Sequence, residues 1–145
     1  MMSALKLEVN AGISYAVLLW PVLDPHVRYL FARETSRKDL VERSESYFMT
    51  VDQMMKGNPQ TILDEKRFDA TPPVLIIQGS ADTNVPLYIP ERFVKTYENL
   101  GAEISYRLFD GMPHGFNGWS QQLWKDATSD IKRFIAKQLG TGRSR

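Results

Sequence analysis

The fold follows from one stretch of sequence, Pro73-Val74-Leu75-Ile76-Ile77-Gln78-Gly79. It is apolar on both sides of an extended chain and rich in β-branched residues, which is typical of a strand buried on both faces of a parallel sheet. A helical pattern follows over residues 86–100, with Pro90 near its first turn and Gly101 after its end. Residues 102–109 then alternate polar and apolar, which indicates a less buried strand nearer a sheet edge.

The same alternation of strands and helices extends to both sides of this unit. Residues 13–20 form an apolar run between Gly12 and Pro21, and we expect a buried strand there. Residues 119–139 predict a final helix, while residues 1–9 resemble the end of a helix. The order predicts an α/β fold with a mostly parallel sheet flanked by helices.

A long region without strand signals separates the first predicted strand from the second. Residues 26–38 and 44–56 predict short helices, the second capped by Ser44 or Ser46, and residues 61–68 are mixed. The region is too long for a simple connection. We therefore expect a helical, cap-like insertion over about residues 25–71.

Composition excludes several classes of function. The 145 residues fit one domain, and the near balance of 18 Lys and Arg against 17 Asp and Glu argues against a nucleic-acid partner. Without cysteine, and with two histidines, the chain predicts no metal site and no cofactor. No apolar stretch reaches the ~20 residues of a membrane span, and residues 1–10 are unlike a signal peptide. We expect a cytoplasmic protein with no membrane partner.

Two loops that follow strands carry residues suited to catalysis. Asp82 lies in the loop over residues 79–86, and His114 lies in the loop over residues 110–116. Parallel sheets place catalytic groups beyond the carboxyl ends of their strands, so the two side chains can meet. An Asp–His pair makes a general base. Taken singly, Asp82 is more often a turn or helix-cap residue and His114 more often an exposed loop residue.

These same segments carry a family resemblance. Residues 72–86, with Gly79-Ser80-Ala81-Asp82-Thr83-Asn84-Val85-Pro86, resemble the acid-bearing strand and turn of α/β-hydrolases. Residues 101–109 with Pro113-His114-Gly115-Phe116 resemble their last strand and histidine loop, and residues 16–25 resemble the strand before the cap. The nearest groups are acetyl-esterase/lipase-like enzymes and prolyl-oligopeptidase-like peptidases. Over about residues 11–139 the resemblance implies that Asp82 is the triad acid and His114 the general base and acid.

The resemblance also requires a nucleophilic serine in a Gly-x-Ser-x-Gly elbow, which the sequence lacks. Ser14 comes nearest, but bulky Tyr15 and an apolar strand follow it; Ser80 fits a turn, and Ser3 has no elbow around it. We expect the nucleophile upstream of Met1. Residues 1–145 are then one incomplete domain, the C-terminal part of an α/β-hydrolase, with little or no activity alone.

Three functions remain open. The resemblance favours hydrolysis of a carboxylic ester of small to medium size through an acyl-enzyme, because the insertion fits the esterase branch. The alternatives are a prolyl-oligopeptidase-like peptidase acting on short peptides and a non-catalytic, hydrolase-derived binding module. A flavodoxin-like domain is disfavoured because no Gly-rich phosphate loop is present. An open strand edge makes an oligomer possible.

Several further residues have both a functional and a structural interpretation. Asp110 is a rival acid or a turn former, and His26 fits a surface position. Aromatic and methionine side chains either line an acyl pocket or pack in the core: Phe48, Met54, Met55, Phe116 and Trp119.

Overall fold

A three-stranded parallel sheet forms the centre of the computed structural model, which describes residues 12–115 and 117–141. The strands are β1 (Ala16–Leu19), β2 (Val74–Gly79) and β3 (Ile104–Phe109), in the order β1-β2-β3. In the register, Ile76 of β2 lies between Leu18 of β1 and Tyr106 of β3. The sheet confirms the predicted α/β class, and β3 is the half-exposed edge strand that its alternation indicates.

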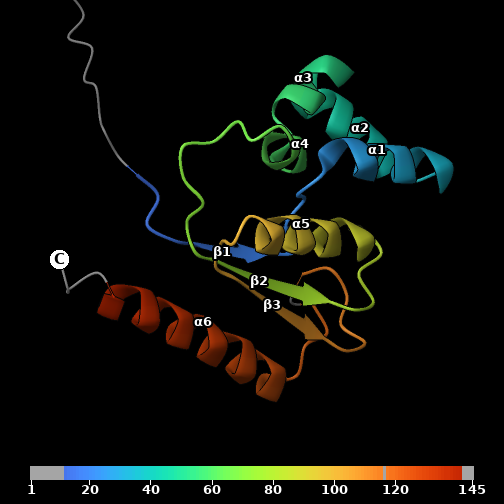
Figure 1. Cartoon of the computed structure of the whole chain (residues 1–145). Coiled ribbons are helices and arrows are strands. Elements are labelled where there is room, and N and C mark those ends of the chain that lie inside the picture. Colours follow the sequence, from blue (N-terminus) through green and yellow to red (C-terminus); the bar gives the residue numbers. More distant parts are fainter. Residues whose placement is uncertain (1–11, 116, 142–145) are drawn as a thin grey trace, which may run out of the picture.

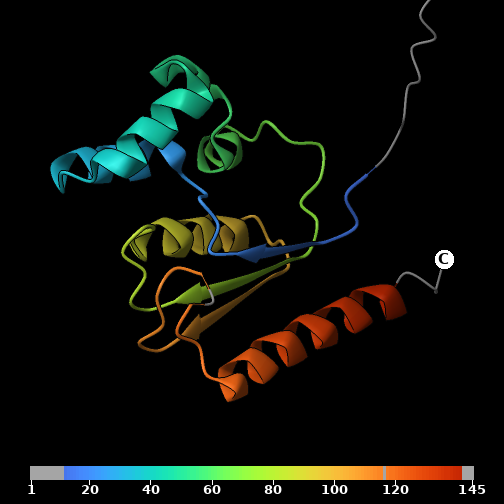
Figure 2. The ribbon, with the colours of Figure 1, turned by 180° about the vertical axis from the view of Figure 1, so that it is seen from behind.

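Helices cover the sheet on both faces. Figures 1 and 2 show α5 (Tyr88–Asn99) on one face and α6 (Gln121–Thr141) on the other. Alternate residues of β2 point to opposite faces. Val74 and Ile76 therefore pack in the core beneath α5, with Ile89, Phe93 and Tyr97, and Leu75 and Ile77 pack in the core beneath α6, with Ala127 and Phe134.

Four short helices lie between β1 and β2 in the chain: α1 (Pro25–Glu34), α2 (Lys38–Phe48), α3 (Val51–Lys56) and α4 (Pro59–Asp64). We call residues 25–64 the four-helix segment. It stacks on the side of α5 that faces away from the sheet (Figure 1). Whether it caps a substrate site, as the sequence suggests for residues 25–71, stays a prediction.

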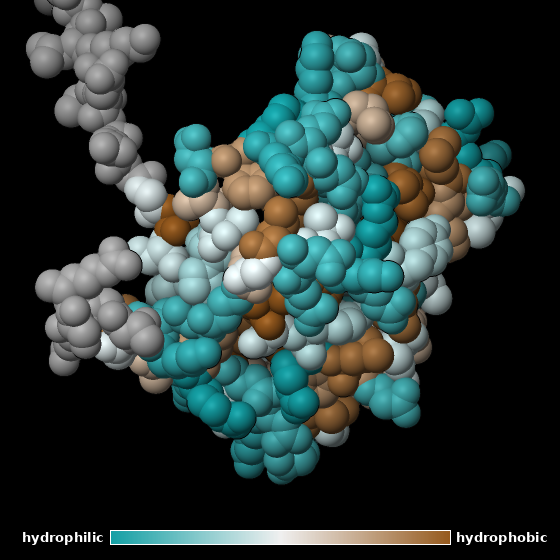
Figure 3. Space-filling view, viewed as in Figure 1, coloured by the Kyte–Doolittle hydropathy of each residue, from teal (hydrophilic) through white to brown (hydrophobic). Residues whose placement is uncertain are grey.

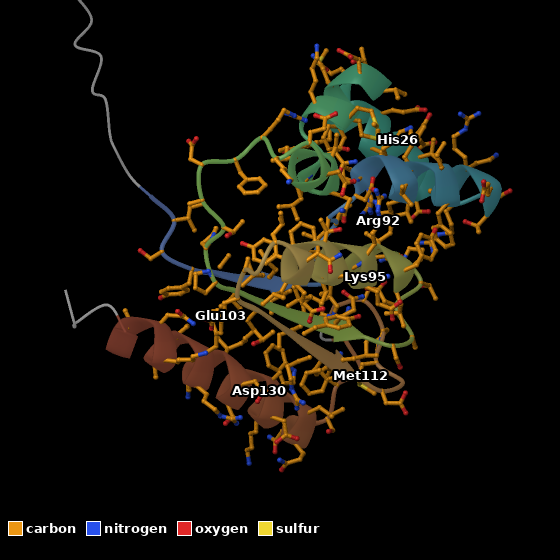
Figure 4. The ribbon with its side chains drawn as sticks, in the orientation of Figure 1. His26, Arg92, Lys95, Glu103, Met112 and Asp130 are labelled. Carbon is orange, nitrogen blue, oxygen red and sulfur yellow. The ribbon has the colours of Figure 1, made fainter. Side chains whose placement is uncertain are left out.

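Polar contacts attach the four-helix segment to α5. Asp24 caps α1, where its Oδ1 accepts hydrogen bonds from the Val27 backbone N–H and from Asn58 Nδ2. Arg92 of α5 donates to Asp24 Oδ2 at 3.3 Å and to Asp64 Oδ2 at 2.6 Å. Figure 4 labels Arg92 between α5 and α1. Asp24 is thus more than the turn residue that its sequence position suggests.

Several predicted boundaries were wrong. The single helix expected over residues 44–56 is two helices, because Met49 adopts φ +60° and Thr50 caps α3 by accepting from the Gln53 backbone N–H. Ser44 is no cap; it lies inside α2 and donates to the Leu40 carbonyl. The strand expected over residues 13–20 spans four residues and is only partly buried, because it pairs with β2 alone within the described part of the chain. The helix end expected over residues 1–9 lies outside the described residues.

The surface in Figure 3 is mostly hydrophilic, with separate hydrophobic patches. Large apolar side chains at the surface include Tyr47 and Met49, both on the four-helix segment. Within residues 12–115 and 117–141, no helix has the length and apolarity needed to cross a membrane.

Candidate active site

The loops that follow β2 and β3 bring Asp82 and His114 together. His114 Nδ1 lies 2.8 Å from Asp82 Oδ2. The Asp82 side chain is fully buried, whereas the His114 side chain is 33% exposed. Both residues lie beyond the carboxyl ends of adjacent parallel strands, where such sheets hold their functional groups. The structure therefore pairs the two predicted site residues; their catalytic role stays a prediction.

Three further donors fix the Asp82 carboxylate. Its Oδ1 accepts from the backbone N–H groups of Asn84 at 2.8 Å and Val85 at 2.9 Å. Its Oδ2 accepts from Gln78 Nε2 at 2.7 Å, beside the bond to His114. With the carboxylate as acceptor, the Nδ1 proton of His114 points at Asp82, and Nε2 of a neutral ring keeps its lone pair.

The two loops are also joined directly. The Ser80 backbone N–H donates to the Phe109 carbonyl and the Ala81 N–H donates to the Met112 carbonyl, both at 2.9 Å. A Cβ on Gly79 would lie 2.1 Å from the Met112 carbonyl oxygen, so only glycine fits there. Figure 4 labels Met112 in the loop beyond β3. This close approach places the His114 loop against the end of β2.

The sequence matches a protein family over the segment that holds this site. Residues 21–142 match the model of the prolyl oligopeptidase family. The chain belongs to the prolyl oligopeptidase family. No curated protein matches the sequence.

Solved structures show the same fold in other proteins. Propionate-bound esterase Est2 of Thermogutta terrifontis is 24% identical with a TM-score of 0.61, over 92% of this chain and 48% of the esterase. The sarin-phosphonylated form of that esterase reaches a TM-score of 0.65 at 24% identity, over 88% of this chain and 44% of the esterase. A mutant of puromycin hydrolase complexed with PGG reaches 0.65 at 23% identity, over 88% of this chain and 18% of the hydrolase. The fold is that of an α/β-hydrolase, and this chain spans about half the length of the esterases and less than a fifth of the puromycin hydrolase.

Two contacts of this family member were not foreseen from its sequence. Arg37, which precedes α2, donates to the Thr83 carbonyl at 3.2 Å and to Asn84 Oδ1 at 2.9 Å. It also binds Asp39, and the hydrogen bonds from Arg37 lower the pKa of that carboxyl. Through Arg37, the four-helix segment thereby binds the two residues that follow Asp82. No sequence signal marks this contact, because it joins residues more than 40 positions apart.

An aromatic cluster lies beside the histidine. The Trp20 ring centroid lies 6.2 Å from that of His114 and 6.0 Å from that of Trp119, which also contacts Phe109. Trp20 has φ +46°, a left-handed conformation that is uncommon for a bulky residue and that collects at functional sites. The sequence placed Trp20 only at the end of a strand. The structure makes it a neighbour of the imidazole ring.

The other candidate residues have structural partners. Asp110 accepts from the Ser80 hydroxyl at 3.0 Å, and the Ser80 oxygen accepts from the Gly111 N–H at 2.7 Å. His26 lies in the first turn of α1, labelled in Figure 4, and is partly exposed. Met54 is buried and Met55 is 36% exposed. Ser3 and Phe116 lie outside the described residues, and the described residues hold no group of three or more potential metal ligands.

Proposed function

We propose that this chain carries the acid and the general base of a serine hydrolase, with Asp82 as the acid and His114 as the base. The observation that carries this proposal is the 2.8 Å contact between His114 Nδ1 and Asp82 Oδ2. Membership of the prolyl oligopeptidase family supports it. The buried carboxylate and the partly exposed imidazole fit the two roles. The base must reach the substrate, whereas the acid only has to bind and orient the imidazole.

The proposed chemistry follows from the orientation of the imidazole ring. Asp82 holds the Nδ1 proton, so Nε2 accepts the proton of a serine hydroxyl as its oxygen attacks the carbonyl carbon of an ester. Asp82 stabilises the resulting imidazolium, which passes the proton to the leaving alcohol oxygen. An acyl-enzyme remains. Water then attacks the acyl carbon, Nε2 takes the water proton, and the same proton returns to the serine oxygen.

We infer that the nucleophilic serine belongs to a segment outside these 145 residues, preceding Met1. The sequence holds no Gly-x-Ser-x-Gly. The Ser80 hydroxyl is engaged by Asp110 and Gly111 in the turn that joins the two loops. Ser14 is exposed and lies before β1, rather than between a strand and a helix as an elbow serine does.

We propose a carboxylic ester of small to medium size as the substrate. The similarity to esterase Est2 and the four helices inserted after β1 support an ester. Peptide hydrolysis is the second candidate, and the match to the prolyl oligopeptidase family supports it. The two candidates differ in the leaving group that His114 must protonate, an alcohol or an amine.

The acid–base pair can be tested in this chain without a nucleophile. We expect the Nδ1–H proton of His114 to resonate downfield of other imidazole protons in the ¹H NMR spectrum, because a buried carboxylate accepts its hydrogen bond. Asp82→Asn removes that acceptor charge and should abolish the downfield signal. Asp110→Asn is the matched control and should leave it unchanged. A signal lost in the control and kept in Asp82→Asn would contradict the proposal.

The reaction is tested in a longer gene product that contains a Gly-x-Ser-x-Gly. We expect it to react with a fluorophosphonate probe and to hydrolyse p-nitrophenyl acetate faster than a peptide p-nitroanilide. His114→Ala should lower turnover roughly 10³- to 10⁴-fold or more. Unchanged turnover in that variant would refute the role of His114. Turnover by the 145-residue chain, abolished by one serine substitution, would refute our inference about the nucleophile.

A further inference from the structure

A cavity separate from the Asp82–His114 pair opens in the four-helix segment. Its volume is about 450 Å³, and it lies between α1, α2 and the beginning of α4. Its walls combine apolar rings with two cationic side chains and a hydroxyl: Pro25, Tyr47, Phe48, Arg28, Arg43 and Ser44. The lining of the cavity therefore combines apolar surface with positive charge.

The guanidinium of Arg28 is held in place but is poorly satisfied. Its Nη2 donates to Ser44 Oγ at 3.0 Å, and Ser44 Oγ in turn donates to the Leu40 carbonyl at 2.8 Å. Its Nε is buried and has no hydrogen-bond partner. A guanidinium offers five N–H donors, and leaving them unpaired on partial burial costs free energy.

The positive charge of the cavity has no counter-charge in contact. Within the described part of the chain, neither Arg28 nor Arg43 forms an ion pair with a carboxylate. Asp39 acts on Arg28 only at longer range, and it is itself bound by Arg37. Burial, followed by the nearby charge of Arg43, lowers the pKa of Arg28. The attraction of a bound anion to the guanidinium would offset both effects.

We propose that this cavity binds an organic carboxylate, with the carboxylate between Arg28 and Arg43 and an apolar body against Phe48 and Tyr47. The planar guanidinium fork matches a carboxylate, and the aromatic walls match an acyl or aromatic group. The body distinguishes this ligand from inorganic phosphate, which has no apolar part. A free acid and the C-terminus of a short peptide share this chemistry. The site does not depend on the proposed hydrolase function.

Titration of the full 145-residue chain, followed by ¹⁵N NMR, tests the proposal. The probes are phenylacetate, its neutral isostere phenylacetamide, N-acetylphenylalanine as a mimic of a peptide C-terminus, and inorganic phosphate. We expect both carboxylates to shift resonances of Arg28 and Arg43 and to bind at least tenfold more tightly than phenylacetamide or phosphate. Tighter binding of N-acetylphenylalanine than of phenylacetate would assign the site to peptide C-termini, and the reverse order to free acids.

Substitutions distinguish binding in the cavity from a general attraction of anions to the positively charged surface. Arg28→Gln and Arg43→Gln should each weaken phenylacetate about tenfold or more. Arg43→Gln keeps the test valid if Arg28→Gln fails to fold, because the Arg43 side chain is exposed and forms no ion pair within the described structure. Arg33→Gln, an exposed arginine of α1 outside the cavity, is the matched control and should bind as the unchanged chain does. Equal weakening in the control, equal binding of phenylacetamide, no binding of either carboxylate, or shifts confined to His114 would overturn the proposal.

Discussion

Substitution of Gly79 by alanine tests whether the end of β2 positions the histidine loop. The new Cβ would lie 2.1 Å from the Met112 carbonyl oxygen, 2.7 Å from the Met112 carbonyl carbon and 2.9 Å from the Pro113 oxygen. Ordinary contact begins at about 3.4 Å, so one of the two segments must move by roughly 1.3 Å. β2 is paired on both sides, whereas Met112 and Pro113 lie in a loop. The loop should therefore be the segment that moves.

The magnitude follows from what this displacement breaks. Overpacking of this kind costs about 1–3 kcal/mol. The hydrogen bond from the Ala81 N–H to the Met112 carbonyl, now 2.9 Å, contributes about 1 kcal/mol more. We expect Gly79→Ala to lower the free energy of unfolding by about 2–4 kcal/mol. Since His114 directly follows Pro113, its 2.8 Å bond to Asp82 should lengthen beyond hydrogen-bonding distance.

Urea unfolding measures the first effect and the downfield imidazole proton of His114 measures the second. Gly12→Ala is the matched control, because a Cβ there meets nothing within 4 Å. We expect the control to change the free energy of unfolding by less than about 0.5 kcal/mol. A Gly79→Ala protein with unchanged stability and an intact His114 signal would refute the reasoning.

Three further substitutions probe other contacts of the fold. Arg92→Ala should cost about 1–2 kcal/mol of unfolding free energy, because the buried Asp24 carboxylate loses its ion pair; an unchanged urea midpoint would contradict this. Tyr106→Phe should raise the free energy of unfolding by about 1 kcal/mol at pH 8, because the phenol oxygen is buried without a hydrogen-bond partner. Burial, with smaller contributions from nearby carboxylates, raises the Tyr106 pKa to about 12, so the neutral phenol is favoured in the folded state and stability falls as the pH rises from about 10 toward 12. The Phe variant should lose less stability than the unchanged chain between pH 8 and pH 11. Arg37→Ala should speed hydrogen exchange at the Asn84 amide with little change in the urea midpoint, and equal exchange in both proteins would show that Arg37 does not brace the loop.

The sequence predicts the second half of this fold well because the signals there are long and unambiguous. β2 begins with four consecutive apolar residues, and α5 and α6 show a sustained helical period. The same reasoning fails in the four-helix segment. The apolar spacing continues across the break between α2 and α3, so the periodicity does not reveal the two-residue bend there. One sequence signal marks the beginning of α4: Asn58 before Pro59 is a cap followed by a first-turn proline.

The pairing of Asp82 with His114 follows from a general property of parallel sheets, which is why the sequence predicts it. The remaining contacts of the site depend on tertiary structure. Gln78 lies within an apolar strand, and nothing in the strand pattern says that its amide reaches Asp82. Arg37 is one of many charged residues in an irregular region, and only the stacking of the four-helix segment on α5 brings it to Asn84. Sequence reasoning thus predicts the Asp82–His114 pair but misses the residues that hold it.

Contacts among the described residues hold Asp82 and His114 in place. The acid is fixed by Gln78 within β2 and by two backbone N–H groups of the turn that follows it. The base is placed by the close approach of its loop to Gly79. A carboxylate held by fixed donors needs little reorganisation when charge develops on the imidazole, which is the condition for electrostatic stabilisation. The pair should therefore keep its geometry whether or not a serine is present, and the His114 NMR signal of this chain should match that of a longer gene product that contains the proposed serine. A downfield proton seen only in the longer protein would show that the nucleophile segment, rather than β2 and its turn, organises the site.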